Sequence, residues 1–420
     1  MQQYSILCGE MDTVDYSKKM TRLKMTFCFI AILMLMQCKS GSSEFVAGDL
    51  VKIDVSQIYA EKEFYIQDIA KVEYIPLETN TNTLMRFRTD AIIHVSDDYI
   101  IAKNYNDGDI FVFDGQGKSK YSFNHKGQGP MEYNVLWDIA FDEKAKEIFV
   151  FDLYKSNIHV YSIDGKYKRT LDFFSGLSDI NMYNFDDETL LVYDNSNVRS
   201  QAISDMSYAN RPYLLISKND GSTIDSLNIH LPVRLSNSAV WRGEQDGQQM
   251  TYSMSIPITT NRSYGKNFII ADWSCDTIYR LTPNCELQPM IVREPPVQST
   301  DPKILISNFL TTNKFILLGI YVMDYKLLKD GGNISQKQLI YDFETGQTNE
   351  YRFKNKDITS ANNVRIWEAI TPGNTGVSMY DVSFLFDLNE KGEIKGDLKE
   401  LLNSLDEDNN PVLMKVKFFN

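Results

Sequence analysis

Residues 91–123 read AIIHVSDDYIIAKNYNDGDIFVFDGQGKSKYSF, and residues 137–173 read WDIAFDEKAKEIFVFDLYKSNIHVYSIDGKYKRTLDF. Each stretch contains four short apolar or alternating runs separated by polar turns, as four antiparallel β-strands would. An Asp-Gly turn comes before the last run of each stretch, and the two glycines, Gly115 and Gly165, lie 50 positions apart. Four strands repeated every 40 to 50 residues or so, about one blade length, are typical of a β-propeller.

The pattern continues toward the C-terminus, where turns at Gly221, Asn284 and Gly346 predict three further blades. The first strand of the fourth blade is expected over residues 252–258. The sixth blade is incomplete, with strands expected over residues 364–367, 377–386 and 411–418 and a helix over residues 397–405. An open ring would expose two sheet edges to aggregation, so an early strand must complete this blade. We predict an all-β fold, a six-bladed β-propeller of four-stranded antiparallel blades, closed by an N-terminal strand within residues 51–77 that joins the C-terminal blade.

The N-terminus has the pattern of a secretion signal. Four basic residues precede an apolar run from Met25 to Met36, which is too short for the roughly 20 residues of a membrane span. The run leads into Leu-Met-Gln-Cys at residues 35–38, which resembles a bacterial lipobox, where the signal is cut before a cysteine that is then lipidated. An ordinary signal peptide with a chance cysteine is the alternative. We predict a signal peptide over residues 1–37, a flexible tether over residues 38–50 lipidated at Cys38, and one propeller domain over residues 51–420.

The formal net charge of −13 argues against electrostatic binding to nucleic acid or to an anionic membrane surface. We therefore expect membrane contact through the lipid anchor only. The expected location is the cell envelope, as an outer-membrane lipoprotein that faces the periplasm or the cell surface, and we expect a monomer. In an exported protein Cys275 and Cys285 could form a disulfide. They flank one short predicted strand, however, so about five extended residues separate them, which argues against such a bond.

Four segments carry a resemblance to a known family. They read VEYIPLET (residues 72–79), KGQGPMEY (residues 126–133), FVFD (residues 149–152) and VYSIDGK (residues 160–166). Together they resemble the six-bladed β-propeller lipoproteins of the Bacteroides group, an NHL-like family whose function is largely unassigned. The resemblance implies six blades, an envelope address and a relation in shape to NHL-repeat propellers, and it implies no reaction.

The lengths of the connections differ systematically. The turns between first and second strands and between third and fourth strands are short, whereas the second-to-third and inter-blade connections are long. In a propeller the two long classes emerge on the same face, where we expect the binding site, with harmless loop growth as the alternative. These loops carry aromatic and arginine residues of the kind that anchor sugars or peptides. The candidates are Tyr208, Arg211, Trp241, Arg242, Trp273, Tyr325 and Trp367, and core packing is the alternative for Trp273.

Three second strands end in an aspartate: Asp152, Asp194 and Asp272. At that end of the strands these carboxylates are expected at the channel mouth, where they could bind Ca²⁺. The alternative is that each carboxylate accepts hydrogen bonds from its own turn. No spacing typical of a Ca²⁺ loop is present, so we expect no cofactor, with Ca²⁺ left open.

Signals for catalysis are sparse. Gly127-Gln128-Gly129-Pro130 could cradle a phosphate, but no helix or Lys-Ser/Thr pair follows, so it is interpreted as a structural link between blades. The sequence contains none of the usual nucleophile-elbow, zinc-protease or Cys-x-x-Cys motifs. We therefore predict an envelope-anchored module that binds or scaffolds a glycan, a peptide or an envelope protein. The alternative is a lyase or hydrolase that uses acidic residues around the channel.

Overall fold

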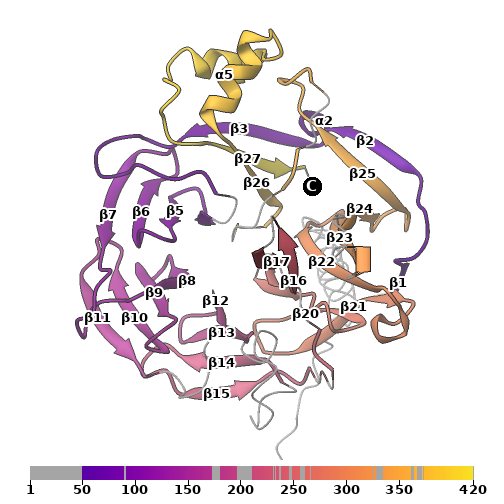
Figure 1. The fold of residues 1–420 in the computed structure, drawn as a ribbon, viewed down its shortest axis with the longest axis horizontal. Helices are drawn as coiled ribbons and strands as arrows, with labels where there is room; N and C mark the ends of the chain where they lie inside the picture. Colours follow the sequence, from indigo (N-terminus) through magenta and orange to yellow (C-terminus); the bar gives the residue numbers. More distant parts are fainter. Residues whose placement is uncertain are drawn as a thin grey trace, which may run out of the picture. The chain divides into compact units, whose positions relative to one another are not determined.

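Six blades surround a common centre in the computed structural model (Figure 1). The structure describes residues 50–419 except for residues 89–90, 173–179, 196–210, 230, 232, 236–237, 246–247, 256–260, 265, 325, 328–333, 361–363, 367–370 and 372. All described residues belong to one compact unit, Asp49–Asn420. The predicted six-bladed propeller is confirmed. The signal peptide and Cys38 lie outside the described residues.

Blades 1 to 3 each contain four consecutive strands. Blade 1 consists of β4 (Ile92–Val95), β5 (Tyr99–Asn104), β6 (Asp109–Asp114) and β7 (Ser119–Asn124). Blade 2 consists of β8 (Leu136–Asp142), β9 (Glu147–Asp152), β10 (Asn157–Ser162) and β11 (Tyr167–Leu171). Blade 3 consists of β12 (Ile180–Asn184), β13 (Thr189–Asp194), β14 (Tyr213–Ser217) and β15 (Thr223–Ser226). Neighbouring blades cover both faces of the middle strands, so every residue of β9 is buried.

Blades 4 and 5 each gain a fifth strand from the N-terminal segment. Blade 4 consists of β18 (Asn261–Tyr264), β19 (Asn267–Ile270), β20 (Thr277–Leu281) and β21 (Leu287–Glu294), with β1 (Val51–Asp54) parallel to β21. A short 3-10 helix, η1 (Val297–Ser299), leads to blade 5. That blade consists of β22 (Lys303–Thr311), β23 (Phe315–Met323), β24 (Ser335–Asp342) and β25 (Thr348–Lys354), with β2 (Glu61–Tyr65) parallel to β25. The connectivity pattern did not predict these two outer pairings.

The expected first strand of blade 4 over residues 252–258 is wrong. Residues 252–255 belong to β17 (Gln248–Ser255), which pairs with β16 (Ser238–Gln245) in a separate two-stranded sheet. The blade begins instead with β18. An alternating run has the same period in a separate hairpin as in a blade, so periodicity could not distinguish the two.

An N-terminal strand closes the ring, as predicted. After α2 (Ile66–Ile69), β3 (Ala70–Pro76) pairs antiparallel with β27 (Val412–Phe418), which pairs in turn with β26 (Thr375–Tyr380). Figure 1 shows β2 and β3 along the outside of the ring.

Two details of blade 6 differ from prediction. The strand expected over residues 377–386 ends at Tyr380, because the carboxylate of Asp381 accepts the Ser383 N–H at 2.9 Å and caps α5 (Val382–Glu390). Residues 364–366 are not in a strand. The second helix, α6 (Gly396–Leu402), lies where a helix was expected.

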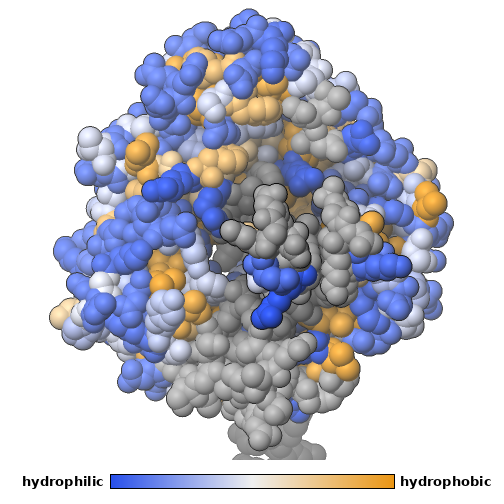
Figure 2. Space-filling model, in the orientation of Figure 1, coloured by the Kyte–Doolittle hydropathy of each residue, from blue (hydrophilic) through white to orange (hydrophobic). Residues whose placement is uncertain are grey.

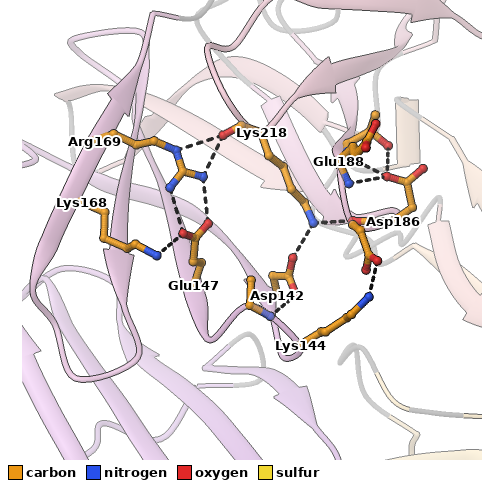
Figure 3. Close-up of polar contacts among 11 residues, drawn as sticks. Asp142, Lys144, Glu147, Lys168, Arg169, Asp186, Glu188 and Lys218 are labelled. Atoms are coloured by element: carbon orange, nitrogen blue, oxygen red, sulfur yellow. Dashed lines mark hydrogen bonds and ion pairs between the residues drawn. The ribbon is translucent and has the colours of Figure 1, made fainter.

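Polar contacts connect blades 2 and 3 at one end of the ring (Figure 3). This end carries the turns between first and second and between third and fourth strands, and it is called the short-turn face. Lys218 Nζ lies 2.6 Å from Asp142 Oδ2 in a buried ion pair, and it also donates to the Asp186 carbonyl. Arg169 binds both carboxylate oxygens of Glu147, at 2.9 and 2.8 Å, and donates to the Lys218 carbonyl. Charged side chains therefore join two blades whose apolar faces already pack together.

Glu147 should make stability depend on pH at the acid end. Hydrogen bonds from Arg169 and Lys168 lower the pKa of the Glu147 carboxyl to about 2. Burial opposes this shift by raising the pKa, but its effect is smaller. The stabilising contribution is complete above the unfolded value near 4.5 and is lost as pH falls through the folded value. The test compares the free energies of unfolding of the wild type and of Glu147→Gln. The difference in favour of the wild type should be about 2 kcal/mol larger at pH 6 than at pH 2. Urea titrations across this range measure it, and a pH-independent difference would contradict it.

Candidate functional site

The second-to-third and inter-blade connections emerge on the face opposite the short-turn face, called here the loop-rich face. Eight of the fourteen exposed large hydrophobic side chains among the described residues lie in these connections: Leu84, Phe87, Met131, Tyr154, Val233, Met250, Leu327 and Phe384. In the described chain, none lies in a first-to-second or third-to-fourth turn. Figure 2 shows one face of the unit, on which hydrophilic residues predominate and hydrophobic residues form separate small patches. The exposed apolar side chains are therefore concentrated on the side that carries the long loops.

A cluster of polar and aromatic residues lies at the loop-rich ends of blades 1 to 3. The rim cluster, as we call it, comprises Arg88, Lys103, Tyr105, Trp137, Asp138, Asn181 and Asn195. Arg88 precedes β4, Lys103 lies near the end of β5 and Tyr105 follows that strand. Trp137 and Asp138 are the second and third residues of β8, Asn181 lies near the start of β12, and Asn195 follows β13. Strand direction alone thus brings these seven residues to one face of the ring.

The aromatic part of the rim cluster lies between two cations. The rings of Tyr105 and Trp137 meet edge to face with centroids 5.8 Å apart. Arg88 and Lys103 both approach the Tyr105 ring, with the guanidinium carbon 5.8 Å and the ammonium nitrogen 5.7 Å from its centroid. Both rings are partly exposed. The arrangement offers an apolar surface next to positive charge.

The polar part of the rim cluster crosses from blade 2 to blade 3. Asp138 Oδ2 accepts the Met182 N–H at 2.7 Å, and Asn195 Nδ2 donates to Asn181 Oδ1 at 2.7 Å. Burial raises the pKa of Asp138, while Lys103 and hydrogen bonds oppose this shift. Amide and carboxylate groups at this place can exchange hydrogen bonds with hydroxyl groups of a ligand.

The aromatic and arginine candidates predicted from the sequence fall into three groups: residues outside the description, exposed residues and one buried residue. Tyr208, Tyr325 and Trp367 lie outside the described residues, as does the side chain of Trp241, whose backbone lies in β16. Arg211, before β14, and Arg242, in β16, are exposed on the loop-rich side. Trp273 is only 3% exposed; its indole N–H donates to the Leu235 carbonyl at 2.6 Å, and its ring packs against Tyr193. Trp273 is therefore a core residue, as the alternative interpretation predicted.

The three strand-end carboxylates lie inside the protein. Asp152 accepts the Asn134 N–H at 2.7 Å and the Tyr154 N–H at 3.0 Å. Asp272 accepts the Ser274 N–H at 2.8 Å and the Tyr213 hydroxyl at 3.1 Å. Asp194 is fully buried, and its carbonyl accepts a hydrogen bond from Arg234. Asp152 and Asp272 thus hold their own loops, and within the described chain no group of three metal-ligating side chains is present.

The glycine-rich segment after β7 is a structural link. The Gly129 N–H donates to Glu132 Oε2 at 2.8 Å, and the buried Tyr133 hydroxyl donates to the Gly108 carbonyl at 2.6 Å. A side chain at Gly127 would clash with the Glu132 carboxylate, because a Cβ would lie 2.0 Å from Oε2. Cys275 and Cys285 are both free thiols.

Sequence reasoning missed the rim cluster. Trp137 and Asp138 lie in a strand whose alternation was interpreted only as blade structure. One signal was available: Lys103 is a charged residue in the otherwise apolar run of β5, YIIAKN, and a lysine in a central strand is unusual unless its charge has a partner.

Comparisons with known proteins agree with the fold. Among the described residues, no helix has the length and apolar character that a membrane span requires.

The solved structure of a Bacteroides fragilis protein described as a "putative exported protein" is similar, with a TM-score of 0.60 at 17% identity, over 89% of this chain and 100% of the other. A DUF4221 family member from Bacteroides vulgatus has a TM-score of 0.46 at 10% identity, with coverages of 84% and 98%. A virginiamycin B lyase of Staphylococcus aureus has a TM-score of 0.36 at 11% identity, with coverages of 83% and 100%.

At these identities the similarity extends to the fold alone. No protein with a curated description matches the sequence. A family model described as "Domain of unknown function (DUF4934)" matches residues 50–417. That range takes in nearly all of the described chain, and the protein therefore belongs to the DUF4934 family.

Proposed function

We propose that the protein is a binding module of the cell envelope that takes its ligand on the loop-rich face. One observation carries the proposal: long connections and exposed apolar side chains both concentrate on that face. Loops held by a rigid scaffold are where proteins usually bind partners, and apolar side chains exposed on such loops are available for contact with a ligand. Among the described residues, the short turns carry none of these exposed apolar side chains, and Lys218 and Asp142 on that face form an ion pair between blades 3 and 2.

An envelope location is part of the proposal. The basic and apolar pattern of residues 1–37 and the lipobox-like Cys38 support export followed by lipid attachment. The similar Bacteroides fragilis protein is described as exported. Glycans, peptides and envelope proteins are therefore the partners to test.

Exposed apolar residues on the two kinds of surface provide a matched test. Leu84→Ser, Tyr154→Ser and Leu327→Ser alter the loop-rich face, whereas Tyr121→Ser and Ile224→Ser alter the outer strands β7 and β15. All five positions are exposed, so each variant should fold like the wild type. Arrays of polysaccharides and of envelope-protein peptides are probed with each purified protein.

We expect at least one loop-face variant to lose about tenfold or more in affinity, as an interface anchor does, while both outer-strand variants bind unchanged. Binding that is lost only with the outer-strand variants would place the site elsewhere. Arrays without any bound member, at concentrations up to the millimolar range, would contradict the binding function itself.

A further inference from the structure

The N-terminal segment 51–65, called here the strap, lies outside two blades that have four strands without it (Figure 1). It contains β1, which is parallel to β21 of blade 4, and β2, which is parallel to β25 of blade 5. By contrast, β3 supplies a strand that blade 6 needs, because it pairs along the whole of β27. The strap is therefore an addition to the ring and not part of its closure.

Few side chains of the strap are buried. Of its residues only Ile53 and Val55 are buried, at 0% and 3% exposure, where they pack among apolar residues of blades 4 and 5. Every residue of β2 except the half-buried Phe64 is exposed, and Ile58 in the connection between the two strands is 84% exposed. Burial of two aliphatic side chains offsets only part of the conformational entropy that is lost when such a segment is ordered.

Ion pairs at exposed positions also hold the strap. Three of them join it to β21 and β25: Lys52–Glu294 at 3.0 Å, Glu61–Arg352 at 3.0 Å and Glu63–Lys354 at 2.7 Å. The six side chains are between 27% and 67% exposed, so solvent and salt weaken these attractions. The hold on the strap is thus weak and sensitive to salt, apart from main-chain pairing and the two buried side chains.

A buried anchor follows the strap directly. Ile66 is fully buried and packs in one apolar cluster with residues of β3, β25 and β27. The Gln67 amide donates to Asn355 Oδ1 at 2.6 Å, and Gln67 Oε1 accepts the Lys356 N–H at 2.9 Å. Detachment of the strap can therefore stop at Ile66 and leave the pairing of β3 with β27 intact.

We infer that the strap detaches from blades 4 and 5 as a unit while the ring stays closed, and that it is a reserve of length for the N-terminal tether. With the strap in place, 12 residues lie between Cys38 and Val51, whereas 27 residues lie between Cys38 and Ile66 once it detaches. The extended length of a chain is proportional to its number of residues, so the reach of an anchored domain roughly doubles. This consequence rests on the envelope anchoring in the proposed function, but detachment itself does not.

Hydrogen exchange separates detachment of the strap from unfolding of the ring. The purified protein is exchanged at increasing urea concentrations below its unfolding transition and analysed by mass spectrometry. Relative to intrinsic rates, strap amides should exchange at least about tenfold faster than amides of β27. Their exchange should also depend less on urea, because a local opening exposes less surface than unfolding does.

A variant with a defect far from the strap provides the second comparison. Lys218→Met breaks the buried ion pair with Asp142 between blades 3 and 2. We expect it to accelerate exchange in β9 of blade 2 about tenfold or more and to leave strap exchange unchanged, because blade 2 stays folded when the strap opens.

Substitutions within the strap test what holds it. Ile53→Ala should accelerate strap exchange about tenfold or more, because a buried side chain is lost. The double variant Glu61→Gln/Glu63→Gln should accelerate it about two- to tenfold at low salt and reduce its dependence on salt. Glu344→Gln, at an exposed carboxylate in a short turn of blade 5, is the matched control and should leave strap exchange unchanged.

Equal protection and equal urea dependence of the strap and β27 would show that both open only with the whole protein, which overturns the inference. Acceleration of strap exchange by Lys218→Met would overturn it too, as would strap amides that exchange at random-coil rates in the wild type. Should Lys218→Met fail to fold, the urea dependence of the wild type gives the same decision. None of these outcomes involves the loop-rich face, so failure of this inference and failure of the proposed binding function are distinguishable.

Discussion

Lys218→Met should destabilise the protein by about 3–5 kcal/mol, the range measured when one partner of a buried ion pair is removed. The side chains of Lys218 and Asp142 are only 6% and 5% exposed, so the substitution leaves a carboxylate in the interior without its cation. The Asp186 carbonyl would lose its donor at the same time. Urea unfolding at pH 7 measures the change.

Two controls separate this cause from simple loss of packing. The double variant Lys218→Met/Asp142→Leu removes both charges and should recover most of the loss, because an apolar pair can replace a buried ion pair. Lys144→Met breaks the contact with Asp187, in which the two side chains are 77% and 66% exposed, and should leave the free energy of unfolding nearly unchanged because solvent screens exposed charges. A Lys218→Met protein within 1 kcal/mol or so of the wild type would show that Asp142 finds water instead.

Removing β3 should abolish the closed fold. A chain that begins at Leu77 lacks the strand that pairs along the whole of β27, from the Val412–Pro76 pair to the Phe418–Ala70 pair. It also lacks Ile75, which packs with residues of blades 1 and 6 in one apolar cluster. The bare edge of β27 would then be open to pairing with other chains. We expect aggregation, or no cooperative melting transition, in size-exclusion chromatography and calorimetry.

A chain that begins at Ala70 is the matched control. It lacks β1 and β2, which add to blades that already have four strands, and keeps β3. We expect a monomer that melts cooperatively at a lower temperature than the full chain. A soluble monomer starting at Leu77 with a wild-type transition would show that ring closure does not depend on β3.

The sequence predicted blade number and ring closure because the blade pattern is local. Turn glycines such as Gly165 and Gly221 have positive φ, at 83° and 80°, so a visible residue type marks each hairpin. The outer pairings of β1 and β2 were not predictable in this way, since main-chain pairing to β21 and β25 depends on how the N-terminal segment runs around the ring. The same holds for Val382–Glu390, whose apolar residues fit a strand until the Asp381 cap is seen.

Sequence patterns indicated which face carries the long loops but did not identify the residues that come together on it. Loop length indicated the face, but Trp273 lies in the core and Asp152 supports a loop. The rim cluster combines one residue from an inter-blade connection, Arg88, with strand-end residues of three blades. Lys103 and Asp138 are 35 positions apart, and only the radial arrangement of blades places them together. Single-sequence periodicity contains no information on such proximity.

The direction of β1 bears on how the molecule would be oriented in a cell. Because β1 is parallel to β21, and β21 starts from the 282–286 turn, Val51 enters the ring from the side of the short turns. If Cys38 is lipidated, the segment between the lipid and Val51 has about a dozen residues, could span no more than roughly 45 Å when extended, and joins the ring on that side. The long loops lie at the opposite end of the ring from this attachment, so a lipid at Cys38 would leave that end free for a partner to approach.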